Sequence, residues 1–266
     1  MRRGETITIP RQELIEKLLR MTLKDDTLFT AVCTHFPDTA QFVLRIIMDK
    51  PDLTVTEVRA QDDERSLLNR SVRLDVLAVD SQAKVYNIEI QQSNEGAAPE
   101  RARFHSALLD SARLEKSQKF TDLPETYVIF ITRDDVLRTG LKLVHVERTI
   151  TELNRPFGDR EHIIYACMKY ADQTPLGWLL NDFLCPQAGQ MHYPELAEKV
   201  RYFKENEKGV GTMCEIMEEL NKMATKERDR EHVQRMLKMG FDKKSIIMAL
   251  GLTEEEFAEL STPLAG

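Results

Sequence analysis

The sequence lacks the features typical of membrane, disulfide-bonded and strongly basic proteins. No apolar run approaches the roughly 20 residues that a membrane-spanning helix needs, and the N-terminus carries two arginines without the apolar core of a signal peptide. The net charge of −7 gives no global basic field, so any DNA contact requires a local patch. The four cysteines are scattered, which favours reduced thiols over a zinc site or a disulfide framework: Cys33, Cys167, Cys185 and Cys214. We therefore expect a cytoplasmic protein with no membrane partner.

The 266 residues suffice for one large domain or two smaller ones. Patterns of strands and helices alternate up to about residue 170 and are helical thereafter. This order predicts an α/β (α+β) fold with a mixed β-sheet flanked by helices and a helical C-terminal region. Proline and glycine cluster between residues 186 and 194. We expect an N-terminal helical arm over 1–24, a central domain over 25–185 and a helical region over 186–266.

Apolar spacing predicts the individual elements. Strands are expected over residues 53–59, 72–79, 85–91, 126–132, 142–150 and 161–167. Helices are expected over residues 11–23, 38–48, 100–115, 176–184, 195–207 and 213–239, followed by two short helices that begin after Asp242 and Thr253. A further helix is expected to follow the capping residues Asp25 and Asp26 and to be interrupted at Pro37. Thr253 with Glu256 forms a capping box for the last of them.

The hairpin formed by residues 72–79 and 85–91 carries two acidic residues. The first strand is rich in Val and Leu, and the second alternates between apolar and polar side chains. Folding the hairpin about Gln82 places Asp75 opposite Glu89. Two like charges directly across an antiparallel pair are destabilising by up to about 1 kcal/mol.

A hard divalent cation held by both carboxylates would offset that repulsion. The residues themselves therefore suggest a carboxylate metal site on a sheet. The alternative is a solvent-facing hairpin whose charges point into water. Spacing alone leaves both interpretations open, because the register is assumed.

With the order strand, Asp, turn, strand, Glu-x-Gln and helix established, the chain resembles the Rpn family of recombination-promoting nucleases and transposases, a branch of the PD-(D/E)XK nuclease superfamily. A short acid-x-Gln motif alone would be weak, but many blocks follow in one order over nearly the whole chain from about residue 25. They are Arg73-Leu74-Asp75-Val76, Tyr86-Asn87-Ile88-Glu89-Ile90-Gln91, Arg101-Ala102-Arg103-Phe104, residues 123–132, 146–150, 162–165 and 175–177, Asp182-Phe183 and Met213-Cys214.

The resemblance implies acids on adjacent strands that bind Mg²⁺ or Mn²⁺. Carried over by position, Asp75 and Glu89 are metal ligands, and the backbone carbonyl of Ile90 is a third. Gln91 completes the implied catalytic set with Asp75 and Glu89, in the place usually held by a lysine that orients the attacking water. An amide can hold a water but adds no positive charge, so catalysis would depend more strongly on the metal.

Three arginines, Arg73, Arg101 and Arg103, are candidates for phosphate contacts under the same resemblance. The sequence departs from the branch at His105, where a tyrosine is common, and at residues 116–120, where a Gly and a Tyr are common. These departures leave the local detail of the helix open, and they do not touch the implied metal site.

The implied function is a metal-dependent DNA endonuclease that hydrolyses phosphodiester bonds in recombination or mobile-element biology. DNA is the expected partner, and a homodimer is expected if the enzyme makes double-strand breaks. Gln91 and the acidic net charge favour an alternative, a catalytically weak or inactive DNA-binding or assembly protein that retains the nuclease fold. A protein-interaction module of unrelated chemistry is a third hypothesis, and no residue pattern supports it directly.

Overall fold

The structure is a computed structural model that describes residues 11–64, 72–93, 95–114 and 117–262, with the side chains of residues 60–64 and 72–74 left out. The chain divides into two compact units. One unit spans residues 20–206, and the other joins the N-terminal segment up to residue 19 with residues 207–266. The domain boundaries predicted from the sequence stay predictions.

A mixed sheet organises the first unit. Within the described residues it has six strands in the order β1-β2-β3-β4-β8-β5. Strands β1, β2 and β3 are antiparallel neighbours, β3, β4 and β8 run parallel, and β5 pairs antiparallel with β8. The strands are β1 (Val55–Glu64), β2 (Val72–Asp80), β3 (Val85–Gln91), β4 (Thr126–Thr132), β5 (Leu143–Val146) and β8 (Glu161–Cys167).

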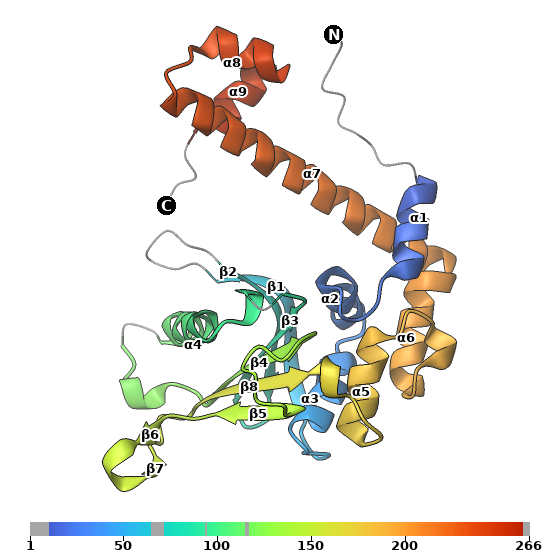
Figure 1. The fold of residues 1–266 in the computed structure, drawn as a ribbon, viewed down its shortest axis with the longest axis vertical. Helices are drawn as coiled ribbons and strands as arrows, with labels where there is room; N and C mark the ends of the chain where they lie inside the picture. The colour runs from blue at the N-terminus through green and yellow to red at the C-terminus, as the bar shows by residue number, and fades with distance from the viewer. Residues whose placement is uncertain (1–10, 65–71, 94, 115–116, 263–266) are drawn as a thin grey trace. The chain divides into compact units, whose positions relative to one another are not determined.

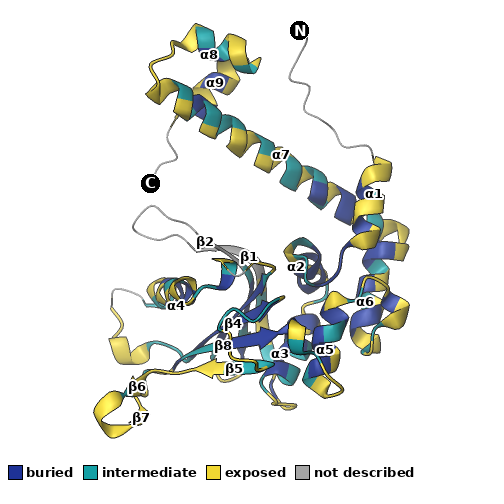
Figure 2. Cartoon of the chain, viewed as in Figure 1, coloured by how far each residue is buried: buried dark blue, intermediate teal, exposed yellow. Residues whose placement is uncertain are grey.

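The strand β4 is central because its sequence suits burial on both faces. It is continuously apolar and β-branched, every one of its residues is buried, and it lies between β3 and β8. Parallel strands need crossover connections, which the helix α4 (Pro99–Arg113) and the segment between β4 and β8 provide. Figure 2 shows the buried residues concentrated in this part of the sheet and in the helix faces against it.

Helices cover both faces of the sheet (Figure 1). On one face, α4 packs against a core formed by Leu77, Val85, Ala97, Ala102, Leu109, Val128, Phe130 and Tyr165. On the other face lie α2 (Asp26–His35), α3 (Asp38–Ile47) and α5 (Pro175–Leu184), and α6 (Pro194–Glu205) packs against α2. The predicted fold class is confirmed.

The prediction of a single strand over residues 142–150 is wrong in extent. Strand β5 ends at Val146, and β6 (Thr149–Ile150) pairs with β7 (Arg155–Pro156) in a separate two-stranded sheet. Beyond Val146 the chain turns to bond with itself, because Phe157 N–H donates to Arg148 O over 2.8 Å and the Arg148 guanidinium pairs with Asp159 and Glu161. Apolar alternation alone does not reveal this change of pairing partner.

The second unit is helical and contains α1 (Arg11–Arg20, up to residue 19), α7 (Glu207–Lys238), α8 (Lys243–Leu250) and α9 (Glu254–Ser261). Val233, Ile246, Phe257 and Leu260 form the small core that holds α8 and α9 against α7. Both predicted caps are present: Asp242 accepts from Ser245 N–H, and Thr253 and Glu256 form the capping box. Short 3₁₀ turns complete the two units at Glu95–Ala97, Phe120–Asp122, Thr151–Leu153, Met168–Tyr170 and Ala188–Gln190.

No helix in the described part of the chain is long and apolar enough to cross a membrane.

Candidate metal and catalytic site

The β2–β3 hairpin has the register assumed from the sequence. Val76 pairs with Ile88, and Leu77 pairs with Asn87. The pairing ends at Val76 and Ile88, so Asp75 and Glu89 occupy the next opposed positions, where the two strands separate. The two acids therefore face each other at the carboxyl end of β3.

Each acid bonds to the backbone of the opposite strand. Asp75 Oδ2 accepts a hydrogen bond from Ile90 N–H over 2.8 Å. In return, Asp75 N–H points to Glu89 Oε1 at 3.3 Å. These side-chain contacts replace the ladder bonds that the strands would otherwise make, and they hold both carboxyl groups close together.

Strand alternation places the two acids on the sheet face that α4 covers. Leu77 and Val85 belong to the core beneath α4, and Asp75 and Glu89 lie an even number of residues from them along their strands. Glu89 is only 1% exposed, whereas Asp75 is half-buried. The solvent-facing hairpin is thus excluded for Glu89.

The environment of Asp75 favours its protonated form in the absence of a cation. Burial raises the pKa of the Asp75 carboxyl to about 8, and the like charge of Glu89 adds to the rise. The negative charge of Asp26 also raises the pKa of Asp75. The hydrogen bond from Ile90 N–H and the Arg101 guanidinium lower it. A cation bound beside this carboxyl would favour its ionised form and lower its pKa.

One oxygen of the acid pair lacks a described partner. Glu89 Oε2 is buried and accepts no hydrogen bond from any residue that the structure describes. Leaving a buried charged oxygen unsatisfied is costly, and a metal cation at that oxygen would satisfy it. The donor set fits a hard divalent ion, because both side chains offer carboxylate oxygens.

The side-chain ligand set is sparse. In the described ranges, no group of three or more His, Cys, Asp or Glu side chains is placed to hold a metal ion. A cation at this position would therefore take its other ligands from backbone oxygens and water, which is how proteins commonly hold Mg²⁺. The carbonyl of Gln91 is directed to the β4 side, where it accepts from the N–H of Arg133, the residue that follows β4. Ile90 alternates with Gln91 and faces the β2 side, where pairing has ended.

Two buried polar side chains lie beside Glu89. His105 of α4 is fully buried, and its Nδ1 lies 3.5 Å from Glu89 Oε1 and 3.2 Å from Asn87 Nδ2. Its ring also packs against Phe130, with centroids 5.8 Å apart. His105 Nε2 and Asn87 Oδ1 are buried without hydrogen-bond partners among the described residues.

The other residues predicted for the site are tied less directly to Asp75 and Glu89. Gln91 is half-buried, and its amide lies against Gly96, where an added Cβ would meet Gln91 Oε1 at 1.9 Å. Arg101 and Arg103 are exposed on α4, and only Arg101 acts on the pKa of Asp75. The side chain of Arg73 lies outside the described residues.

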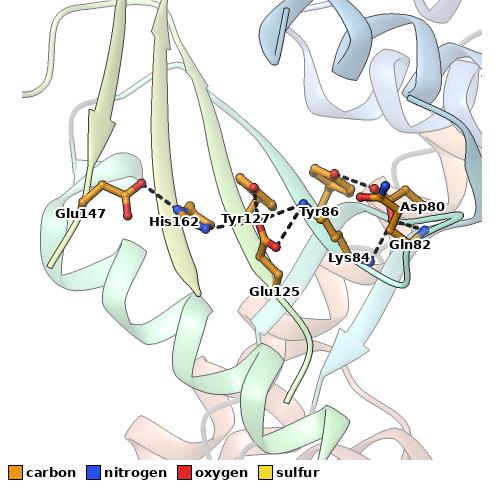
Figure 3. A network of polar contacts seen from close by, with 8 residues as sticks. All are labelled: Asp80, Gln82, Lys84, Tyr86, Glu125, Tyr127, Glu147 and His162. Atoms are coloured by element: carbon orange, nitrogen blue, oxygen red, sulfur yellow. Dashed lines mark hydrogen bonds and ion pairs between the residues drawn. The ribbon is translucent and has the colours of Figure 1, made fainter. Parts of the chain in front are cut away.

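A second polar cluster lies on the opposite face of the sheet, at the amino ends of β3, β4 and β8 (Figure 3). Tyr86, Tyr127 and His162 stack side by side, with ring centroids 4.9 Å and 4.5 Å apart. Glu125 binds Lys84 and Tyr127, and Asp80 accepts from Tyr86. Because its charges are already paired, this cluster is a poor candidate for a ligand site.

Asn87 and His105 were not among the residues predicted for the site. Asn87 could have been found from strand alternation, since it lies two residues before Glu89 on the same face. His105 could have been found from helical spacing, since Ala102, His105 and Leu109 form the buried stripe of α4. Its contact with Glu89 depends on how α4 is placed across the sheet, which the sequence does not specify.

Comparison with known families agrees with this geometry. The family described as PD-(D/E)XK nuclease family transposase matches residues 42–175, which is half of the chain and includes both acids. A comparison with curated proteins and with solved structures gave no match. The expected family resemblance is confirmed.

Proposed function

The chain belongs to the PD-(D/E)XK nuclease family transposases, and from this premise we propose that it is a metal-dependent DNA endonuclease. The substrate is a phosphodiester bond, and the cofactor is Mg²⁺ or Mn²⁺ held by Asp75, Glu89 and the carbonyl of Ile90. The proposal rests chiefly on one observation: two opposed carboxylates share a buried position, and Glu89 Oε2 has no partner among the described residues.

The two acids would hold the cation, and their like charges become an advantage once it binds. A divalent ion there supplies Lewis acidity and neutralises charge that develops on the phosphate during hydrolysis. Asp75 Oδ2 is fixed by Ile90 N–H, and Glu89 Oε1 faces Asp75 N–H. The backbone thus orients both carboxyl groups before any ligand arrives.

Gln91 and the arginines would act on the water and the DNA. The Gln91 amide can accept from and donate to a water, which positions it for attack on phosphorus as the bridging P–O bond breaks. Arg101 and Arg103 are exposed on α4 and would contact phosphate oxygens. Because the net charge is −7, such local contacts would have to provide most of the attraction to DNA.

Nicking of supercoiled plasmid in Mg²⁺ or Mn²⁺ tests the proposal. We expect nicking by the full chain, none after chelation, and a loss of at least about 100-fold in Asp75→Ala, because removal of a metal ligand removes charge stabilisation at the phosphate. Asp110→Asn is the matched control: Asp110 is also a half-buried carboxyl whose pKa burial raises, but it faces Glu161 and Arg148 rather than Glu89. Equal nicking by the wild type and Asp75→Ala would exclude Asp75 from the mechanism.

A second function is favoured by one feature, the amide of Gln91 in place of a lysine. A protein that binds DNA and assembles on it without cutting would need no group to orient water. Tight DNA binding in the presence of chelator, together with no cleavage in any divalent metal, would support that function over the nuclease.

A further inference from the structure

The fully buried His105 stands beside the acid pair with no role assigned to it. Burying an imidazole next to a carboxylate orders both groups and costs desolvation, so it needs a compensating contact. The only carboxylate within 4 Å of its ring in the described residues is Glu89, at 3.5 Å from Nδ1. The position of His105 is thus tied to one metal-ligand candidate, and this inference rests on the proposed function.

Three buried atoms at and around His105 lack hydrogen-bond partners among the described residues: His105 Nε2, Asn87 Oδ1 and Glu89 Oε2. If Asn87 Nδ2–H donated to Nδ1, the Nδ1 lone pair would face Glu89 Oε1, and Asn87 Oδ1 would remain without a partner. Oxygen and nitrogen of an amide have nearly the same shape and exchange by a half-turn. After that half-turn Asn87 Oδ1 accepts from Nδ1–H, Nδ2 takes the amide position without a described partner, and the protonated Nδ1 lies 3.5 Å from Glu89 Oε1.

We propose that His105 is a positioning residue for the metal ligand Glu89. Its Nδ1–H, fixed in that tautomer by the Asn87 amide, faces Glu89 Oε1 together with Asp75 N–H. Among the described residues, Oε1 has Asp75 N–H at 3.3 Å and His105 Nδ1 at 3.5 Å, whereas Oε2 has no partner, so the two oxygens of the carboxylate are unequal. Oε2 is therefore the oxygen directed to the cation, and His105 sets that direction.

Packing supports a fixed ring rather than a mobile one. His105 is one of the buried residues of α4 and lies against Phe130 of β4, which is itself fully buried. A ring held on one side by an aromatic side chain and on the other by Asn87 has little freedom to turn. Partners that orient a ligand in this way commonly change metal affinity by about 10- to 100-fold when they are removed.

Variants that separate the donor from the bulk test the inference. In His105→Asn the side-chain amide can place an N–H where Nδ1–H was. In His105→Gln the amide N–H lies near the former position of Nε2. His105→Phe keeps an aromatic ring but has no donor. Ser106→Ala is the control, since Ser106 is the next buried residue of α4 and bonds only to Ala102 O within that helix. The four variants would be compared with the wild-type full chain.

The primary measurement is calorimetric titration with Mn²⁺ alone, without DNA. We expect His105→Phe and His105→Gln to bind Mn²⁺ about 10- to 100-fold more weakly, and His105→Asn and Ser106→Ala to remain within about threefold of the wild type. In plasmid nicking, the loss should be recovered partly by raising the Mn²⁺ concentration, while KM for DNA stays constant. If His105→Phe does not fold, His105→Gln carries the same test with a polar side chain.

Unchanged Mn²⁺ affinity in folded His105→Phe or His105→Gln would overturn the inference, as would equal losses in His105→Gln and His105→Asn. Failure of the proposed function has a different signature. If the wild type binds Mn²⁺ but does not nick DNA, the nuclease proposal fails, and the calorimetry of the variants still decides the role of His105. If the wild type binds no Mn²⁺, both fail together.

Discussion

Two polar clusters occupy opposite faces of the same sheet and opposite ends of β3, and they differ in how their charges are satisfied. In the cluster of Figure 3, Glu125 accepts from Tyr127 and Lys84, so its two oxygens are both paired. At the acid pair, Glu89 Oε2 has no partner among the described residues and Asp75 faces a like charge.

The pKa values of Glu125 in one cluster and Asp75 in the other reflect this difference. Burial opposes the ionised form of Glu125, but hydrogen bonds from Tyr127 and Lys84 outweigh it and hold the pKa of Glu125 below its ordinary value. Burial and Glu89 together raise the pKa of Asp75 to about 8. The charges of the first cluster are therefore balanced by its own side chains, whereas under the proposed function the second would be balanced by a bound cation.

The largest expected effect comes from removing one charge from each cluster without changing side-chain shape. Glu89→Gln should reduce plasmid nicking by at least about 100-fold while leaving the metal-free protein as stable or more so, because the charge that helps to raise the pKa of Asp75 is removed. Glu125→Gln should keep nicking and destabilise the fold by about 1 kcal/mol, since charged hydrogen bonds are lost at a partly exposed position. Nicking rates and urea unfolding of both variants measure this.

The comparison would fail if the two variants behaved alike. A Glu89→Gln protein that is less stable without metal and still nicks DNA would show that the acid pair is structural. A Glu125→Gln protein that has lost nicking at full stability would show that the paired cluster takes part in function.

The next effect is the pH dependence of stability without metal. The folded pKa of Asp75 is raised from 3.8 to about 8, so its contribution to stability is fully present below about pH 4 and is lost as the pH rises through about 8. The contribution of Glu125 has the opposite sign: its folded pKa is lowered, so that contribution is present above its unfolded pKa and is lost as the pH falls through the folded value.

Urea unfolding of the chelator-treated protein from pH 5 to pH 9 separates the two. We expect the free energy of unfolding to fall with pH by on the order of a few kcal/mol, and this slope to be reduced in Asp75→Asn but not in Glu125→Gln. Added Mn²⁺ should also reduce the slope, because the cation competes with the proton. A slope that survives in Asp75→Asn would assign the effect to other groups.

The sequence predicted much of the fold and the opposed positions of two acids, whose role stays a prediction. Strong local patterns fixed β4 and β8 at their observed bounds, and the like charges of Asp75 and Glu89 depended only on a hairpin register that turn geometry and alternation determine. The partners of Glu89 from α4 required tertiary placement, so His105 entered only as a departure from a family pattern. The end of β5 at Val146 was missed for a different reason: the chain beyond it pairs in a short local hairpin between β6 and β7, which alternation alone does not distinguish from a continuation of β5.

A smaller effect is expected from Gly96, which the Gln91 amide contacts. In Gly96→Ala the new methyl group would meet Gln91 Oε1, the far end of a flexible side chain, so the fold should tolerate it while the amide moves. If Gln91 orients the attacking water, kcat for nicking should fall by about 10-fold, since a misplaced catalytic group costs rate rather than binding. Gly189→Ala is the control, because a Cβ there meets nothing within 4 Å. Equal kcat in both variants would remove Gln91 from the mechanism.

The smallest effect distinguishes two arginines of α4 that differ in their reach to the acid pair. Arg101 is among the principal groups that lower the pKa of Asp75, whereas Arg103, exposed two residues further on, is not. If both contact phosphate, Arg101→Ala and Arg103→Ala should each reduce the salt dependence of DNA binding by about one unit in the log–log slope. Only Arg101→Ala should also shift the pH at which Mn²⁺ binds upward, because the Asp75 proton is then harder to displace. Identical pH profiles for the two variants would show that Arg101 serves the DNA alone and does not offset the charge of the acid pair.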